Sequence, residues 1–210
     1  MSGLELVAWI CAAVMFGAFT IEGLVSYFVL KDGRHELGDS FLNIGLSIGY
    51  VVARLVIGAG VAWALLLIYE ATPLRWSMGS WWHWVVLLLV EDFFYYWSHR
   101  ASHAYRFMWI SHVTHHSSPV MNLSTGLRNS WIGGAIDWVF FIPPVALGFH
   151  PLALAAVIGV ASAVDFLTHT PYVGKLPVLD WIINTPSNHS VHHALNPQYL
   201  DNNLGGALII

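Results

Sequence analysis

The amino-acid sequence predicts an all-α fold, a multi-pass bundle of membrane helices. Of the 210 residues, 57% are hydrophobic and 10% are charged, and the mean hydropathy is +0.62. A soluble domain usually has about a quarter of its residues charged. The apolar residues also gather into long uninterrupted stretches, as membrane-spanning helices require. Composition and stretch length together place the chain in a bilayer.

The first part of the chain, residues 1–98, is predicted to form three membrane spans. Residues 4–30 and 41–69 are almost entirely apolar. At about 1.5 Å per helical residue, each is long enough to cross about 30 Å of hydrocarbon. A third span, over about 81–97, lies between tryptophan-rich ends that are typical of the membrane interface.

Charged residues predict how these spans are oriented. Glu22 and Arg54 are costly in lipid, so they are expected to face the bundle or each other. Lys31 and Arg34 make the first loop more basic than the second, which has Arg75 alone. Basic residues favour the cytoplasmic side, so the first loop and the region after residue 98 are predicted to lie there. The membrane would be a bacterial inner membrane or the endoplasmic reticulum.

Residues 99–210 form the second predicted region, with a membrane hairpin at about 131–168. Its two apolar segments, 131–147 and 152–168, are each marginally long for a full crossing. Two consecutive prolines break the first segment. We therefore expect a helical hairpin that enters and leaves on the same side of the membrane.

Nine of the twelve histidines follow a pattern that predicts metal binding. They occupy one HxxxH motif, two HxxHH motifs and one isolated position: His99, His103, His112, His115, His116, His169, His189, His192 and His193. Residues one turn apart share a helix face. Nine imidazoles are more than one metal ion needs and about what two need. The lone Cys11 excludes an internal disulfide and a cysteine-based site. The sequence therefore predicts a polyhistidine dimetal cap on the cytoplasmic side of the bundle.

Two carboxylates are predicted to support these ligands. Asp92 lies seven residues before His99 on one helical stripe, where it could accept the free N–H of a ligating imidazole. The alternative is an ion pair with Arg100. Asp165 lies one turn before His169 and could orient it in the same way, whereas the alternative for His169 is a hydrogen-bonded interfacial histidine.

Neighbouring residues carry further expectations. Tyr96 is predicted to share the stripe of Asp92, and Glu91 to point elsewhere on that helix. The remaining histidines are interpreted as structural: His35, His83 and His150.

The ligand type alone leaves the metal open, because imidazole suits iron, zinc, copper and nickel. The HxxxH motif lacks the glutamate of zinc hydrolases, which weakens a hydrolase interpretation. Two irons at the edge of a bilayer could instead activate O₂ and oxidise a lipid C–H bond. A non-catalytic metal-binding or transport protein is the alternative, although a transporter would place its ionisable ligands near the bilayer midplane. The net charge of −4 and the scattered basic residues exclude a nucleic-acid surface.

The motifs resemble the fatty acid hydroxylase and sterol desaturase superfamily of membrane non-haem di-iron enzymes, over roughly residues 91–210. Several stretches look most similar to its alkylglycerol monooxygenase branch: 112–118 (HVTHHSS), 122–128 (NLSTGLR), 166–170 (FLTHT), 184–193 (NTPSNHSVHH) and 201–210 (DNNLGGALII). These matches extend beyond the histidines themselves.

The resemblance implies O₂-dependent hydroxylation of a lipid, a fatty acyl chain, sterol or ether lipid, by two irons that the nine histidines bind. Zinc could replace iron in purified protein. Electrons would come from a separate donor, and the branch uses a tetrahydropterin. A lipid desaturase with the same ligands is the alternative outcome. Relatives continue beyond the last matched stretch, so we expect this chain to be truncated at its C-terminus.

A substrate slot is expected between the third span and the hairpin. Phe94, Trp138 and Phe141 would line it and accommodate one alkyl chain. Substitution of Gly133 or Gly134 by a bulky residue would then fill the slot. The alternative is that these aromatic side chains face lipid or fill the bundle.

Overall fold

The computed structural model describes residues 2–209, and its secondary structure is helical, as predicted. The longer elements are α1 (Gly3–Leu24), which continues as the π-helical turn η1 (Val25–Leu30), α2 (Leu37–Ala71), α3 (Trp81–Ala104), α4 (Arg106–His112), α7 (Pro151–Thr168) and α8 (Pro186–His192). The shorter ones are η2 (His115–Ser117), η3 (Thr125–Leu127), α5 (Gly133–Ile136), η4 (Asp137–Phe141), α6 (Ile142–Ala146) and η5 (Leu179–Trp181).

Within residues 2–209, three helices are long and apolar enough to cross a membrane, which supports an integral membrane protein. They are α1 with η1, α2 and α7. The three predicted spans included α3 instead of α7. Helix α3 combines apolar residues with Glu91, Asp92, Arg100 and three histidines, which lowers its hydropathy. A crossing by α3 therefore stays a prediction, as does the hairpin that includes α7.

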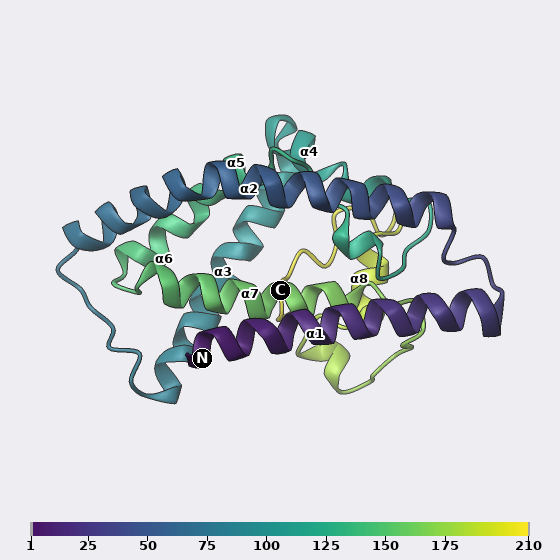
Figure 1. The fold of residues 1–210 in the computed structure, drawn as a ribbon, viewed down its shortest axis with the longest axis horizontal. Coiled ribbons are helices and arrows are strands. Elements are labelled where there is room, and N and C mark those ends of the chain that lie inside the picture. The colour runs from purple at the N-terminus through teal and green to yellow at the C-terminus, as the bar shows by residue number, and fades with distance from the viewer. Residues whose placement is uncertain (1, 210) are drawn as a thin grey trace.

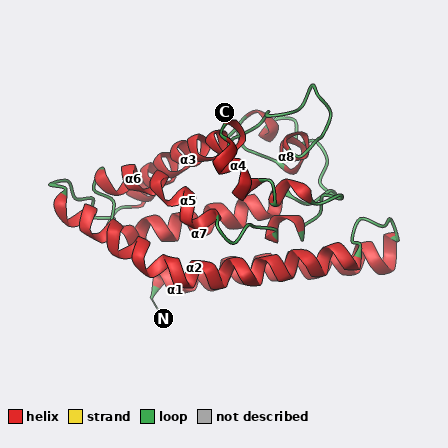
Figure 2. Cartoon of the chain, turned by 90° about the horizontal axis from the view of Figure 1, so that it is seen from above, coloured by secondary structure: helices red, strands yellow, loops and turns green. Residues whose placement is uncertain are grey.

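The long helices are arranged in layers. Helices α1 and α2 run in opposite directions along one side of the molecule, and α7 lies between them in projection (Figure 1). The perpendicular view shows α7 above this pair, with α3 and α8 on the far side (Figure 2). Helix α7 contacts α1, α2 and α3, so it is the central element of the bundle.

The apolar core lies where α2 ends and α3 begins, against α6 and α7. Its buried members are Leu65, Leu87, Val145, Phe149, Ala153, Leu154 and Val157. Trp76 closes it by stacking on Phe149 with ring centroids 4.7 Å apart. Gly148 has φ +95°, and a Cβ there would lie 2.6 Å from the backbone of Leu74, so this close approach requires glycine.

The first limb of the predicted hairpin is broken, but at a different point from the one expected. Pro143 and Pro144 begin α6 instead of ending a helix, because a first helical turn tolerates proline. The break lies earlier, where α5 passes into the 3₁₀ helix η4. The second limb is the continuous helix α7.

Glu22 and Arg54 do not pair with each other. The Glu22 carboxylate is buried, 2.8 Å from Nε2 of His35, and it accepts a hydrogen bond of 2.7 Å from the Leu123 amide. Arg54 donates to the Tyr50 hydroxyl at 2.9 Å. Glu22 thus faces the bundle as expected, and His35 has the structural role expected of it.

Candidate metal centre

The nine predicted histidines lie together in two groups. His99, His103, His112, His116 and His192 form the first group, and His115, His169, His189 and His193 form the second. Within each group, one ring nitrogen per residue lies within 4.8 Å of all the others. The sequence thus identified every member of both groups, and each group is suited to holding one metal ion.

Each HxxHH motif contributes to both groups. In the first motif, His112 and His116 enter the first group and the intervening His115 enters the second. In the motif on α8 the assignment is reversed, because His192 alone joins the first group. Adjacent residues in a helix point about 100° apart, so His115 and His116, like His192 and His193, are directed to different groups. The spacing HxxHH therefore lets one short segment reach two metal sites.

Backbone and side-chain oxygens fix the tautomer of five imidazoles. The pairs, with the Nδ1 to oxygen distance, are His99 with Leu204 O (3.0 Å), His103 with Asp201 Oδ1 (2.9 Å), His115 with Arg128 O (3.2 Å), His169 with Asp165 O (2.9 Å) and His192 with Asn202 O (3.0 Å). A carbonyl oxygen can only accept, so Nδ1 carries the hydrogen in these rings. In the neutral ring, Nε2 is then left with a bare lone pair.

These bare nitrogens point at one another. Nε2 of His115 lies 3.1 Å from Nε2 of His169, although both rings have their hydrogen on Nδ1. Two facing lone pairs repel unless a cation lies between them. Two nitrogens bound at about 2.1 Å and at right angles would be about 3.0 Å apart, whereas a tetrahedral pair would be about 3.4 Å apart. Further Nε2 pairs are separated by 3.0–3.2 Å: His99–His112, His112–His116, His116–His192, His169–His189 and His189–His193.

Burial keeps these imidazoles neutral. Burial and, after it, the neighbouring imidazoles lower the pKa of His116 to about 2. Burial also lowers the pKa of His192 to about 4, although the hydrogen bond to the Asn202 carbonyl opposes this shift. Burial likewise holds the pKa of His112, His115 and His193 well below the ordinary value. A neutral imidazole is the form that binds a metal, so the donor set fits metal ions without prior loss of protons.

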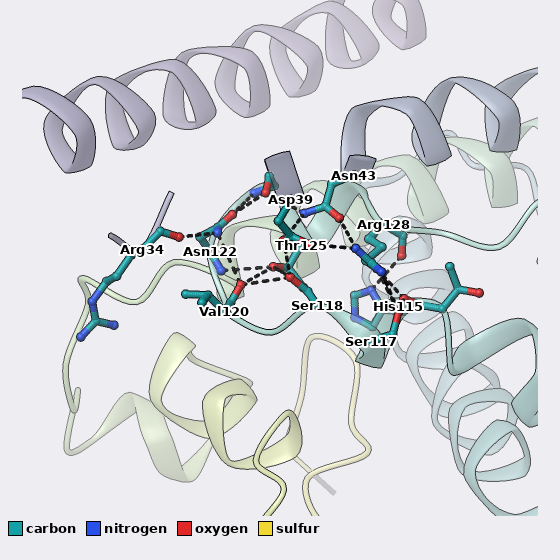
Figure 3. Close-up of polar contacts among 12 residues, drawn as sticks. Arg34, Asp39, Asn43, His115, Ser117, Ser118, Val120, Asn122, Thr125 and Arg128 are labelled. Atoms are coloured by element: carbon teal, nitrogen blue, oxygen red, sulfur yellow. Dashed lines mark hydrogen bonds and ion pairs between the residues drawn. The ribbon is translucent and has the colours of Figure 1, made fainter. Parts of the chain in front are cut away.

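A polar network supports the loop that carries the first HxxHH motif (Figure 3). Arg128 is its centre: it pairs with Asp39 at 3.0 Å and donates to Asn43 at 2.8 Å, both on α2, and to the carbonyl of Thr114 at 2.8 Å. Its own carbonyl accepts the hydrogen bond from His115. The start of α2 is thereby joined to the ligands of the second group. Sequence reasoning noted Arg128 within a matched stretch but assigned it no role.

Asp92 and Asp165 lie near the histidines, but neither carboxylate accepts a hydrogen bond from an imidazole within residues 2–209. Oδ1 of Asp92 accepts hydrogen bonds from the amides of Ala207 and Leu208, at 2.5 Å and 3.3 Å. Asp165 meets His169 through its backbone carbonyl. The role predicted for these two carboxylates in metal affinity therefore stays a prediction.

Other expectations for α3 are wrong. Tyr96 accepts a hydrogen bond from Arg100 at 2.6 Å, so Arg100 does not pair with Asp92. Glu91 does not point away but lines the same cavity as Asp92, because side chains one residue apart can both border a wide cavity.

A loop segment, residues 201–209, orients the first group, and sequence reasoning missed it. Asp201 and the carbonyls of Asn202 and Leu204 each accept a hydrogen bond from one of its histidines. Asp92 holds the far end of the segment. The resemblance of this segment to the family motif DNNLGG could have drawn attention to it. The hydrogen bonds that its backbone carbonyls accept could not be predicted, because every residue type has the same carbonyl.

A cavity of about 440 Å³ lies beside the histidines, between α2, α3, α7 and residues 126–141. His99, His112 and His115 border it at one end, and apolar side chains such as Val61 and Ile158 border the other. Trp138 and Phe141 line it as expected, as does Gly134, whereas Phe94 and Gly133 do not. The prediction for Phe94 is wrong because the cavity lies against another side of α3.

The fold and the site define a membrane protein with two polyhistidine groups suited to metal ions, beside a cavity lined by both apolar and polar side chains. Residues 84–210, more than half of the chain, match the family model described as fatty acid hydroxylase. The chain belongs to the fatty acid hydroxylase family.

Named relatives are similar to this chain over part of their length. Alkylglycerol monooxygenases of Xenopus tropicalis and Homo sapiens are 42% and 41% identical over 142 residues, which is 68% of this chain and 31% of each relative. That of Caenorhabditis elegans is 33% identical over 98% of this chain and 40% of its own length. The chain thus spans less than half the length of these relatives. No solved structure matches it.

Proposed function

We propose that the protein hydroxylates a membrane lipid with O₂, using two iron ions held by the nine histidines. The observation that carries the proposal is the set of bare, converging Nε2 atoms, which border a cavity with an apolar end. Membership of the fatty acid hydroxylase family supports the same reaction class. The overall change would be RH + O₂ + 2e⁻ + 2H⁺ → ROH + H₂O.

Iron fits the first group better than zinc. The first group offers five imidazoles, whereas zinc is almost always four-coordinate and tetrahedral in structural protein sites. The nitrogen separations of 3.0–3.2 Å are closer to right-angle coordination than to a tetrahedron. When bound, iron would supply the O₂ activation and C–H oxidation that side chains alone cannot perform.

The chain's own residues would position the substrate. Trp138, Phe141 and Ile158 would pack along an alkyl chain and exclude water, and so hold one C–H bond near the histidine end of the cavity. The acceptors at Leu204, Asn202 and Arg128 would keep the imidazoles oriented through turnover.

The relatives' names direct the choice of substrate. Since these relatives are called alkylglycerol monooxygenases, we propose an ether lipid as the substrate to test first. A separate donor would supply electrons, and a tetrahydropterin is the candidate to test first. The histidine end would face the cytoplasm, because the basic first loop lies beside it: Arg34 O accepts a hydrogen bond of 2.7 Å from Asn122.

The test combines metal analysis with turnover. Protein purified in detergent and reconstituted with iron(II) should consume O₂ and form a hydroxylated product from a long-chain alkylglycerol when tetrahydropterin is present. Zinc-loaded protein is the matched control and should be inactive. Lack of lipid oxidation with tetrahydropterin, reduced flavin and reduced ferredoxin alike would contradict the proposal.

A further inference from the structure

Four carboxylates line the cavity beside the histidines. Glu91 and Asp92 come from α3, Asp137 from η4 and Asp165 from α7, and all four border the cavity. The Tyr95 phenol, which also borders it, lies within electrostatic range of all four. Acidic side chains from three separate elements therefore converge on a space that is otherwise suited to an alkyl chain.

Several of these carboxylate oxygens lack a partner. Oδ2 of Asp92, Oδ1 of Asp137 and Oδ1 of Asp165 are buried and accept no hydrogen bond from any residue in 2–209. Asp92 is only 2% exposed and Glu91 only 5%. A buried acceptor without a donor is costly, and native proteins rarely keep one unless a ligand or water satisfies it.

These carboxylates do not form a metal-binding group of three or more. In the described part of the chain, the groups of at least three potential ligand atoms within 4.8 Å of one another contain histidines alone. A ligand that contacts these carboxylates from different elements would therefore use several of its own atoms.

The unpaired acceptors restrict what this ligand is. Among the residues that line the cavity, Arg54 carries a guanidinium, and it donates to the Tyr50 hydroxyl at 2.9 Å. An ionised carboxylate or phosphate headgroup offers acceptors alone, so it would leave these oxygens without a donor. Hydroxyl and amine groups donate hydrogen bonds and would satisfy the acceptors.

We propose that Asp137, Asp165 and Glu91 form a headgroup subsite that accepts hydrogen bonds from hydroxyl or amine groups of a lipid and excludes anionic headgroups. Tyr95 and Glu91 lie one and two turns before His99, about 6 and 12 Å along α3. The headgroup would therefore bind beside the metal centre, and the alkyl chain would extend toward Val61 and Ile158. The subsite rests on the proposed function only in taking the ligand to be a lipid.

Binding under nitrogen separates this proposal from turnover. Metal-loaded protein in detergent is titrated with four radiolabelled probes of equal chain length: an alkylglycerol, an alkylamine, a fatty acid and an alkyl phosphate. The alkylglycerol or the alkylamine should bind at least on the order of ten-fold more tightly than both anions. If the alkylglycerol binds more tightly than the alkylamine, the subsite takes hydroxyl donors; if the alkylamine binds more tightly, it takes amine donors.

Variants assign the preference to the named residues. Asp137→Asn and Asp165→Asn should each weaken binding of the favoured probe about ten-fold and reduce discrimination against the fatty acid, with metal content unchanged. An amine probe should lose more than a hydroxyl probe, because an amide keeps an acceptor but loses the charge. Glu70→Gln, an exposed carboxylate at the end of α2 with a 73% exposed side chain, is the control and should change nothing.

Two outcomes would overturn the subsite. One is equal or tighter binding of the fatty acid or alkyl phosphate to the parent protein. The other is unchanged affinity in both aspartate variants that retain the parent's melting temperature. Loss of metal in Asp165→Asn with unchanged lipid affinity would instead return Asp165 to a role in orienting His169. Absence of turnover would leave these binding results unaffected, so failure of the enzyme proposal is distinguishable.

Discussion

Single residues decide which metal site each histidine serves. His115 belongs to the second group although both of its motif partners belong to the first, and His192 belongs to the first group although His189 and His193 belong to the second. Sequence spacing predicts that such histidines bind metal, but not which ones share an ion. That division depends on the angle between α4, η2 and α8, which only the folded chain defines.

The division makes a prediction about metal content. The parent protein should bind about two irons per chain. His115→Ala should lose metal from the second group and His192→Ala from the first, so each should retain about one, and the double variant should retain close to none. Metal analysis after gel filtration in detergent measures this. His83→Ala, outside both groups, is the control. Full retention of two ions in the double variant would contradict the assignment.

At the scale of elements, the network around Arg128 joins α2 to the loop between α4 and α5. The Arg128–Asp39 pair is nearly buried, with side chains 10% and 9% exposed. Removal of one partner leaves the other as an unpaired buried charge. The network therefore contributes mainly by holding the loop in one position.

Arg128→Ala should destabilise the protein by about 3–5 kcal/mol, because the Asp39 carboxylate would lose its partner. Combination with Asp39→Asn should recover part of this loss, since no charge is then left unpaired. Chemical unfolding in detergent, followed by tryptophan fluorescence, measures both. Arg106→Ala, at the exposed start of α4, is the control. Equal losses for the single and double variants would show that the pair matters little.

The short helix α5 forms one wall of the cavity. Gly134 and Arg54 both line the cavity, and a Cβ on Gly134 would lie 3.4 Å from Cγ of Arg54. Gly133 does not line the cavity. Gly134→Leu should therefore lower activity on long alkyl chains at least ten-fold more than on short ones, with two irons retained. Gly133→Ala serves as the matched control. Identical chain-length profiles for parent and Gly134→Leu would place the substrate elsewhere.

Long apolar helices and regularly spaced histidine motifs could be predicted from the sequence, whereas the contacts of irregular segments could not. The apolar runs of α1, α2 and α7 and all nine histidines followed from local pattern. The hydrogen-bond acceptors in residues 201–209 did not, because a carbonyl is the same in every residue. The contact of Arg128 with Asp39 joins positions 89 residues apart, and no local pattern records such a pair.

At the scale of the whole molecule, the first loop and the histidines lie at the same end. Tyr172, which follows His169 closely, donates to Asp32 in that loop at 2.8 Å. Helix α2, with 35 residues, is about 52 Å long and leads from this end to the opposite one. Its length exceeds the hydrocarbon thickness of about 30 Å, so it would tilt or extend beyond the bilayer.

This arrangement predicts a labelling pattern. In a Cys11→Ser background, Arg34→Cys and Gln198→Cys should react with a membrane-impermeant maleimide from one side of sealed vesicles. Glu70→Cys, at the other end of α2, should react from the opposite side. Inverted vesicles should reverse the pattern. Reaction of Arg34→Cys and Gln198→Cys from opposite sides would contradict a common face for loop and histidines.

The segment 201–209 has a consequence for the order of biosynthesis. It supplies the acceptors for His99, His103 and His192, although His99 is synthesised about a hundred residues earlier. While the ribosome is still translating this segment, the rings of α3 have no fixed tautomer and no fixed direction. The rings of the first group therefore gain these acceptors only after the segment has docked on Asp92. In the second group, His115 and His169 take theirs from Arg128 and Asp165, which are synthesised earlier, whereas Asn184 beside His189 donates to Gly205 of the late segment.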